Sequence, residues 1–388
     1  MSLTDLEPFF DVVPVSPAGW PVFCTLAAPN RAALERLPNW PRAGLPAAGR
    51  AAGGRGLDWE TAKLSGLGEA VEIASLCRWG DEATVTARAG DLQREVWTAA
   101  ALGGFAEPQL SARDAWNAHM AGTDRVVQRD DDAEMEWVAA RDLEGGSVWV
   151  PVDCVFLGAG LADTNGCAAG QSDRDARSRA LFELIERDAT GRWWYGRRSR
   201  PLLSDAQLDD AGRALCERFT NQGFTLRLFD ITTDLGVASV AAAGMLPGGA
   251  PALGFASGAD FASAATRALT EMGQVALVLR GAGAAVLRAD GARWLEEVSF
   301  ATPPISLGVA GIDPPAPADR IGSALRDAGI RVAFVNQSRA ELGVPVWRAL
   351  SPDLCHWKPR LGRSRLLAPD PRDLGGPPGA MNPVLLRL

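Results

Sequence analysis

The chain has 388 residues and a formal net charge of −8, with 47% hydrophobic and 22% charged residues. This balance is typical of a globular protein with a substantial core, and the length allows more than one domain-sized unit. The charge is spread along the chain without a Lys/Arg-rich block, which argues against a nucleic-acid-binding protein.

Targeting signals and zinc-binding motifs are also missing from the sequence. The first 23 residues carry three acidic residues and four prolines instead of the basic start and apolar run of a signal peptide. No stretch of about 18 uncharged apolar residues occurs, so we expect a cytoplasmic protein that does not enter a membrane. The six cysteines form no C-x-x-C pair and the two histidines are far apart, so neither a zinc site nor a disulfide framework is expected.

Lysine is nearly absent, and arginine carries almost all of the positive charge. The only lysines are Lys63 and Lys358, and neither follows a Gly-rich turn. A Walker loop ends in Lys-Ser or Lys-Thr. Any ATP chemistry in this chain must therefore use another kind of phosphate site.

The first half of the chain mixes strands and helices. We expect strands at 22–27, 84–89, 135–140 and 147–156, and helices over 57–79 and from Ser111 to Met120. The turn between the last two strands contains Gly145 and Gly146. The Gly-rich segment 53–56 is predicted to be the most flexible point of a loop, and 164–170 to be a small-residue turn.

The second half continues the irregular mixture. Helices are predicted over 173–194, 204–221, 261–279 and 321–327, and strands at 224–229, 237–242, 252–256, 331–335 and 346–350. The prolines of 314–317 indicate a hinge. The Pro/Gly-rich tail 369–388 is expected to lie in extended form on the surface or in a groove. Without a regular parallel alternation, the pattern favours an α+β fold over a doubly wound one.

Three of the predicted helices share one spacing of residues. Each has an alanine, followed at offsets of three, five, seven and ten by a polar residue, a leucine and two further polar residues. The copies are Ala62, Ser65, Leu67, Glu69 and Glu72; then Ala176, Arg179, Leu181, Glu183 and Glu186; then Ala264, Arg267, Leu269, Glu271 and Gln274. Offsets of three, seven and ten lie on one helical face, so each helix carries one polar stripe.

The neighbours of these stripes are mostly apolar or small, which indicates largely buried helices. A buried carboxylate is costly unless a cation or hydrogen bonds compensate it. Five glutamates and one glutamine therefore suggest a shared interior site, and Mg²⁺ is the natural partner for such oxygen ligands. One alternative is three solvated helix faces. Another is a duplication that preserves packing alone, which would not explain the repeated acids.

At these residues the chain resembles the YcaO family, whose ATP site is built from such helices without a Walker motif. The segment 54–57 with Ser65, Glu69 and Glu72 resembles the family's Gly-Lys-Gly segment and S-x-x-x-E-x-x-E helix. Arg55 replaces the usual lysine, and Ile73 replaces an arginine that often follows the second acid.

The other two copies carry the resemblance further. The segment 164–170 and the run LFELIERDA at 181–189 resemble the family's small-residue loop and E-x-x-E-R helix, with Gln171 in place of asparagine and Asp175 in place of glutamate. The segment 267–274 resembles R-A-L-T-E-x-x-Q.

The resemblance implies a YcaO-like fold with internally repeated helix–sheet units around a buried site for ATP and Mg²⁺. It implies a catalytic domain over 51–368, preceded by an N-terminal segment 1–50 and followed by the tail 369–388. The Mg²⁺ ligands would be Glu69, Glu72, Glu183, Glu186 and Gln274. The residues that bind ATP would be Arg55, Ser65, Asn165, Gln171, Asp175, Arg187, Arg267 and Glu271.

The end of the chain, from His356 onwards, resembles the end of azoline-forming members. Those often finish in a P-x-P-x-P tail that enters the active site, whereas here only Pro383 remains of that pattern. By the resemblance, the terminal carboxylate of Leu388 is a candidate catalytic base. An ordinary disordered tail is the alternative.

The activity implied by the resemblance is ATP-dependent activation of a backbone amide in a ribosomally made peptide, with cyclodehydration favoured. Thioamide or amidine formation and a non-catalytic subunit of the same fold remain alternatives. The implied partners are a precursor peptide and a separate, ThiF-like protein that binds its leader. A homodimer is also considered.

Overall fold

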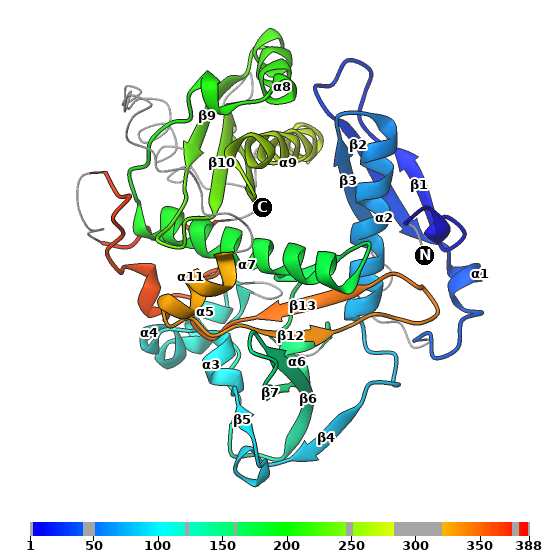
Figure 1. Ribbon diagram of the computed structural model, residues 1–388, viewed down its shortest axis with the longest axis vertical. Coiled ribbons are helices and arrows are strands. Elements are labelled where there is room, and N and C mark those ends of the chain that lie inside the picture. The colour runs from blue at the N-terminus through cyan, green and yellow to red at the C-terminus, as the bar shows by residue number, and fades with distance from the viewer. Residues whose placement is uncertain are drawn as a thin grey trace.

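The computed structural model describes residues 3–41, 51–120, 124–158, 161–245, 251–282, 320–374 and 380–386. Within these ranges, three β-sheets are packed with three long helices that come together in the middle of the molecule (Figure 1). The long helices are α2 (Trp59–Leu76), α7 (Asp173–Gly196) and α9 (Phe261–Ala282). This arrangement confirms the expected α+β class.

Two of the sheets have three antiparallel strands each. One has the order β1-β2-β3, with β1 at Phe10–Pro14, β2 at Phe23–Pro29 and β3 at Ala52–Gly56. The other has the order β11-β10-β9, with β9 at Thr225–Asp230, β10 at Ala238–Met245 and β11 at Pro251–Gly258. The helix α8 (Asp210–Asn221) packs beside α9 near this second sheet.

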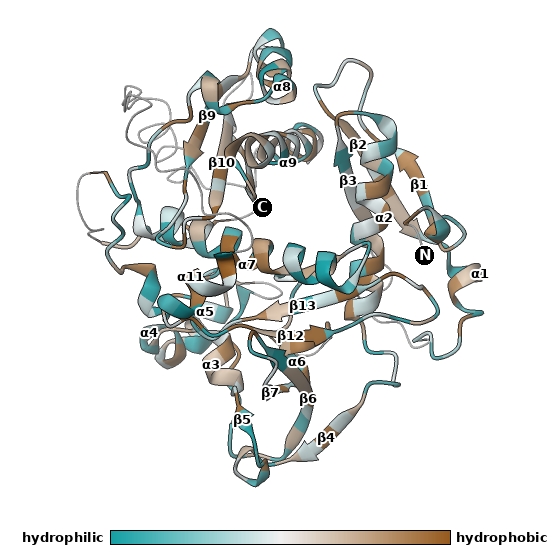
Figure 2. Cartoon of the chain, viewed as in Figure 1, coloured by the Kyte–Doolittle hydropathy of each residue, from teal (hydrophilic) through white to brown (hydrophobic). Residues whose placement is uncertain are grey.

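The third sheet has seven strands in the order β5-β7-β6-β12-β13-β8, with β4 paired to β6. Its strands are β4 (Thr84–Ala87), β5 (Glu95–Val96), β6 (Met135–Asp142), β7 (Ser147–Pro151), β8 (Cys167–Ala169), β12 (Ala333–Asn336) and β13 (Val346–Leu350). The shorter helices are α1 (Arg31–Leu34), α3 (Ala99–Gly103), α4 (Glu107–Ser111), α5 (Arg113–Asn117), α6 (Val152–Val155) and α11 (Ile321–Asp327). Strands such as β10 and β12 are mainly apolar, whereas the first turns of α7 are hydrophilic (Figure 2).

Each long helix follows a strand, and the three strand–helix units have the same local construction. The helices begin after Asp58, Ser172 and Asp260, whose side chains accept a hydrogen bond from the backbone amide three residues on. Four residues after each of these caps comes the repeated alanine, Ala62, Ala176 or Ala264, which is fully buried in all three units.

A glycine lies six positions before each of these alanines, at the end of the preceding strand. A Cβ atom on Gly56 would lie 2.6 Å from the amide nitrogen of Ala62, and one on Gly170 would lie 2.3 Å from that of Ala176. Contacts below about 3 Å would force the helix away from the strand. The small residues therefore allow α2 and α7 to pack directly on their strands, whereas at Gly258 a Cβ atom would still lie 3.6 Å from the amide nitrogen of Ala264.

The same close packing corrects the prediction that 53–56 is a flexible loop, because these residues form β3 against α2. A Cβ atom on Gly54 would lie 2.1 Å from the carbonyl oxygen of Ala62. The close approach of the helix requires these glycines. Local composition alone does not distinguish such a Gly-rich strand from a flexible loop.

Three further elements differ from the prediction. The chain leaves the strand after Pro151 and forms α6, so 147–156 is not one strand. Ser111 ends α4 instead of capping a helix, and α5 begins at Arg113. The predicted turn at 164–170 contains β8, which pairs with β13. The proposed hinge at 314–317 lies outside the described residues.

Of the tail 369–388, the structure describes 369–374, which includes a turn, and 380–386, which packs against the protein without forming a helix or strand. Asn382, Val384 and Leu386 are buried while the residues between them are more exposed, which is the alternation of an extended chain on a surface. This agrees with the expected extended form for 380–386, whereas the turn at 371–372 departs from it and Leu388 lies outside the described residues. None of the helices in the described ranges has the length and apolar character needed to cross a bilayer.

Candidate active site

The polar stripes of α2, α7 and α9 face one another. The carboxyl group of Glu69 on α2 is close enough to Glu271 on α9 and Arg187 on α7 for both to influence its pKa. Likewise, Glu72 interacts with Glu183 on α7. The three stripes therefore converge on one interior region, as the spacing of the repeat predicted.

A ring of hydrogen bonds links the last polar residue of each stripe to the strand of the next unit. Glu72 Oε1 accepts a hydrogen bond of 2.7 Å from the amide of Ala169 in β8. Glu186 Oε2 accepts one of 3.3 Å from the amide of Ser257 in β11.

The third contact of the ring has a different donor. Arg55 in β3 donates from Nη1 to Oε1 of Gln274 at 3.1 Å. Ala169, Ser257 and Arg55 each stand one position before the packing glycine of their unit, so equivalent positions take part in all three contacts. The repeat thus builds a closed ring of three units.

Three arginines lie among these acids. Arg187 makes ion pairs with Glu186, at 2.8 Å from Nη1, and with Glu183, at 3.5 Å from Nη2. Arg55 lies 3.6 Å from Glu271. Arg267 is more exposed and donates to the carbonyl oxygen of Ser257 at 3.1 Å. The centre therefore holds both signs of charge, and its cations are arginines in place of a Walker lysine.

Burial raises the pKa values of several acids in this centre. It raises the pKa of Glu183 to about 7, although the neighbouring Arg187 opposes the shift. It also raises the pKa of Glu69 and Glu186, and the pKa of Glu72 lies well above its usual value. Carboxylates in this condition are stabilised in their charged form when a divalent cation binds.

The residues present fit Mg²⁺ bound together with phosphate. In the described part of the chain, no three His, Cys, Asp or Glu side chains are already grouped to hold a metal ion. Mg²⁺ usually takes one or two carboxylates and completes its shell with water and phosphate oxygens. Acids presented by neighbouring helices, such as Glu69 on α2 and Glu183 on α7, suit that mode of binding.

Asn165 lies beside this centre, in the loop before β8. Its backbone amide donates to Asp163 Oδ1 at 2.9 Å, while its own side-chain oxygen Oδ1 is buried without a hydrogen-bond partner. A buried polar atom without a partner is rare and is often satisfied by a ligand or water. Asn165 therefore fits the predicted role in holding a nucleotide.

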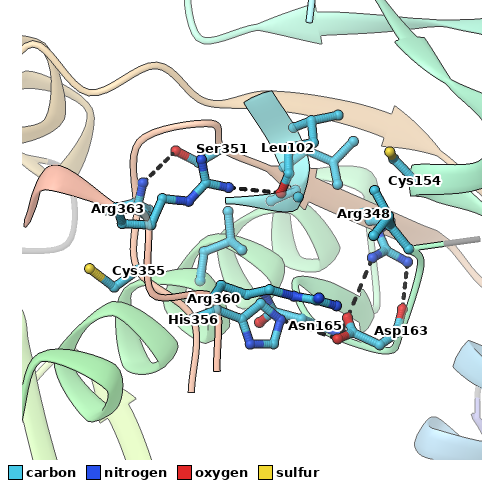
Figure 3. A pocket seen from close by; sticks show the side chains of 16 residues that line it. Leu102, Cys154, Asp163, Asn165, Arg348, Ser351, Cys355, His356, Arg360 and Arg363 are labelled. Atoms are coloured by element: carbon cyan, nitrogen blue, oxygen red, sulfur yellow. Dashed lines mark hydrogen bonds and ion pairs between the residues drawn. The ribbon is translucent and has the colours of Figure 1, made fainter. Parts of the chain in front are cut away.

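A cavity of about 60 Å³ lies behind Asn165 and is bordered by Asp163, His356 and Arg348 (Figure 3). His356 Nδ1 accepts a hydrogen bond of 2.9 Å from the amide of Lys358, so the ring hydrogen is on Nε2, which lies 3.1 Å from Asp163 Oδ2. Burial lowers the pKa of His356. Both ring nitrogens are thus engaged within the protein, and His356 fixes the loop of Asn165 instead of acting as a base.

The remaining predicted residues lie at the edge of the site. Ser65 is half-buried, one turn before Glu69 on the same stripe. Gln171 is exposed just before α7. Asp175 accepts from the amide of Gln171 at 3.0 Å and from Arg179 Nε at 3.0 Å, so its contacts stabilise the start of the helix.

Sequence reasoning did not find the contacts of Asp163, Tyr195 and Trp357. Trp357 lies with its ring 5.2 Å from the guanidinium carbon of Arg187, and the hydroxyl of Tyr195 donates to the carbonyl oxygen of Trp357 at 3.0 Å. Tyr195 is the only tyrosine in the chain, which is the one sequence signal that could have singled it out.

Comparison with known proteins agrees with this geometry. The family model described as YcaO cyclodehydratase, ATP- and Mg²⁺-binding, matches residues 53–355. An uncharacterized protein of Methanothermobacter thermautotrophicus is 28% identical over 252 residues, which are 57% of this chain and 66% of that protein. An uncharacterized protein in the tfuA 3′ region of Rhizobium leguminosarum bv. trifolii is 27% identical over 210 residues, which are 50% of this chain and 45% of that protein.

Solved structures share the fold. A heterocyclase in complex with substrate and cofactor has a TM-score of 0.80 and 23% identity, over 97% of this chain and 54% of that one. The heterocyclase TruD has a TM-score of 0.64 and 25% identity, over 78% of this chain and 46% of that one. The YcaO protein of Methanopyrus kandleri, bound with AMPPCP and Mg²⁺, has a TM-score of 0.63 and 21% identity, over 92% of this chain and 89% of that one. This chain therefore spans about half the length of both heterocyclases. With its family match over most of its length and its ring of three acidic helices, the chain belongs to the YcaO family.

Proposed function

We propose that this chain is an ATP-dependent enzyme that activates a backbone amide in a ribosomally synthesised peptide. The favoured reaction is cyclodehydration of Cys, Ser or Thr to thiazoline or oxazoline. The side chain attacks the preceding carbonyl carbon, and the carbonyl oxygen takes the γ-phosphoryl group of ATP. That oxygen then leaves as phosphate while the amide nitrogen loses its proton, so the peptide loses one water and ATP becomes ADP.

The observation that carries the proposal is the closed ring of three polar stripes with arginines at its centre. Phosphoryl transfer depends mainly on positioning and on neutralising phosphate charge. Mg²⁺ would be held by Glu69, Glu72, Glu183, Glu186 and Gln274, and it would neutralise charge on the phosphate oxygens.

The chain's own residues would do the rest of the positioning. Arg187, fixed by Glu183 and Glu186, would present its guanidinium to the phosphates, with Arg55 and Arg267 on the neighbouring units. Asn165 would use its unpartnered side-chain oxygen to accept a hydrogen bond from the nucleotide. Ser65, Gln171, Asp175 and Glu271 would complete the rim of the nucleotide site.

No protein nucleophile is required, and neither Cys77 nor Cys167 suits that role. Cys77 and Cys167 are buried, and burial raises the pKa of both thiols, to about 11 for Cys77. The terminal carboxylate of Leu388 stays the proposed base. The docked tail supports this, because the amide of Asn382 donates to the carbonyl oxygen of Tyr195 at 2.7 Å on α7, the helix that carries Glu183.

The alternative within the family is thioamide or amidine formation, in which an external sulfur or amine nucleophile attacks the activated amide. The end of the chain supports this alternative, because Pro383 is the only proline that remains of the P-x-P-x-P ending of azoline-forming members. A substrate-binding partner, ThiF-like by resemblance, is proposed for either reaction. A similar fold occurs in the E. coli microcin synthetase complex McbBCD with pro-MccB17 bound, which supports the proposal that this chain acts together with a partner protein.

The test combines the chain with precursor peptides and partner proteins encoded beside its gene, and follows phosphate release and product mass. Cyclodehydration predicts ATP consumption that requires the peptide and a product lighter by one water. Exchange of oxygen for sulfur increases the mass and would select the alternative. Full activity without a partner would reject the partner proposal, and an unchanged peptide mass would reject amide activation.

A further inference from the structure

The described tail is held on the C-terminal end of α7 by several contacts. The amide of Asn382 donates to the carbonyl oxygen of Tyr195 at 2.7 Å, and the indole of Trp194 donates to the carbonyl oxygen of Val384 at 2.7 Å. Val384 and Leu386 are buried in the same apolar cluster as Trp194 and Tyr195. The segment 380–386 is thus an integral part of the packing around α7.

The hydroxyl of Tyr195 joins this segment to another part of the chain. It donates to the carbonyl oxygen of Trp357 at 3.0 Å. Burial raises the pKa of this hydroxyl, and the nearby backbone amide of Leu386 opposes the shift. Tyr195 is 1% exposed, so solvent cannot replace the acceptor, and a buried hydroxyl that keeps its acceptor has a fixed orientation.

Trp357 carries the connection to the nucleotide site. Its ring lies 5.2 Å from the guanidinium carbon of Arg187, within the range of a cation–π contact. The amide of Cys355 donates to Asp188 Oδ1 at 2.8 Å, which ties the loop of Trp357 to the same helix. Arg187 in turn holds Glu186 at 2.8 Å. Three contacts therefore lead from Leu386 through Tyr195 and Trp357 to Arg187.

We propose that Tyr195 is a positioning residue that couples docking of the segment 380–386 to nucleotide binding at Arg187. The inference rests on the proposed function, because it takes Arg187 to be a residue that contacts phosphate. Coupling between two binding events is reciprocal, so a nucleotide that fixes Arg187 must also stabilise the docked segment.

The test measures hydrogen exchange of the Asn382 and Val384 amides with and without Mg²⁺ and AMPPCP. In the wild-type chain the nucleotide slows this exchange by about fivefold, within the usual range of coupling between sites. In Tyr195→Phe the response is lost, while the affinity for AMPPCP falls by no more than a similar factor. Tyr195→Phe keeps the ring in its apolar cluster and removes only the hydroxyl.

A second pair of variants, one test and one control, examines the coupling from the tail. Leu386→Pro removes the amide that faces the Tyr195 hydroxyl and also loses the response, without altering α7. Leu385→Pro makes the same change one position earlier and keeps the response. A wild-type chain that does not bind AMPPCP with Mg²⁺ contradicts the proposed function and the coupling with it. Binding without slower exchange in the tail, or an undiminished response in Tyr195→Phe, overturns the coupling alone.

Discussion

Arg55 and Gln274 are 219 positions apart, and the hydrogen bond between them closes the ring of the three repeated units. The contact joins β3 of the first unit to α9 of the third at 3.1 Å. In the other two units a glutamate accepts from a backbone amide. Here the neutral Gln274 accepts from an arginine, and Glu271, 3.6 Å from its other terminal nitrogen, is the acid that lies beside that guanidinium. This arrangement favours Arg55 as a residue that faces phosphate.

Replacement of Glu183 by Gln removes a charge from the centre while keeping the shape of the side chain. We expect ATP consumption in the presence of peptide and partner to fall to the background rate, because the proposed Mg²⁺ site loses an anionic ligand. Glu217→Gln on the exposed face of α8 is the matched control and should retain full activity. Normal activity in Glu183→Gln would support a non-catalytic subunit or a site elsewhere.

Nucleotide affinity should depend on pH through the acids of the ring. Because the pKa of Glu183 is raised to about 7, its proton must leave before Mg²⁺ binds, and affinity rises with pH until it levels off above about 7. Below that pH the loss approaches tenfold per unit for one proton released. Calorimetric titration with Mg²⁺ and AMPPCP between pH 6 and 8 checks this.

The raised pKa of Glu183 also affects the stability of the protein without nucleotide, and in the opposite direction. A carboxyl group whose pKa is higher in the folded than in the unfolded state binds more protons when folded, so its contribution to stability falls as pH rises from about 4.3 to 7. The increase in Tm produced by Mg²⁺ and AMPPCP should therefore grow from pH 6 to pH 8. An increase that is constant over this interval contradicts the account.

The close packing of β3 on α2 predicts a large effect of a small substitution. Gly54→Ala would place a methyl group 2.1 Å from the carbonyl oxygen of Ala62, and we expect a loss of about 1–3 kcal/mol in the free energy of unfolding. Gly90→Ala, where the added methyl group meets nothing within 4 Å, is the control. Urea denaturation of both variants measures the difference. Equal stability of the two would show that α2 does not need this contact.

A buried carboxylate holds the first part of the tail 369–388. The carboxylate of Asp370 is fully buried and lies 3.1 Å from Arg192 and 3.2 Å from Arg200. Asp370→Asn leaves these guanidinium groups without their shared anion, and we expect a loss of about 3 kcal/mol or more in stability. Asp210→Asn, which breaks an exposed pair with Arg213, should have no measurable effect. Equal unfolding midpoints for the two variants would contradict a structural role for Asp370.

The local parts of this architecture could be predicted from the sequence. The three long helices, their polar stripes and their convergence follow from offsets along a helix, and α11 and β13 have the predicted bounds. The ring contacts could not be predicted, because the link from Glu186 to Ser257 depends on how two units pack. The three residues of β8 are likewise too few to show a strand pattern, and their pairing partner β13 follows about 180 residues later.

The most direct test of the central claim is a calorimetric titration with Mg²⁺ and AMPPCP of three variants, one for each long helix: Glu69→Gln, Glu183→Gln and Glu271→Gln. The account predicts one nucleotide per wild-type chain, binding that requires Mg²⁺, and a loss of affinity of at least about tenfold in every variant. Unchanged Mg²⁺-dependent affinity in a variant of any one helix would show that its stripe takes no part in the site and would contradict the three-helix nucleotide centre.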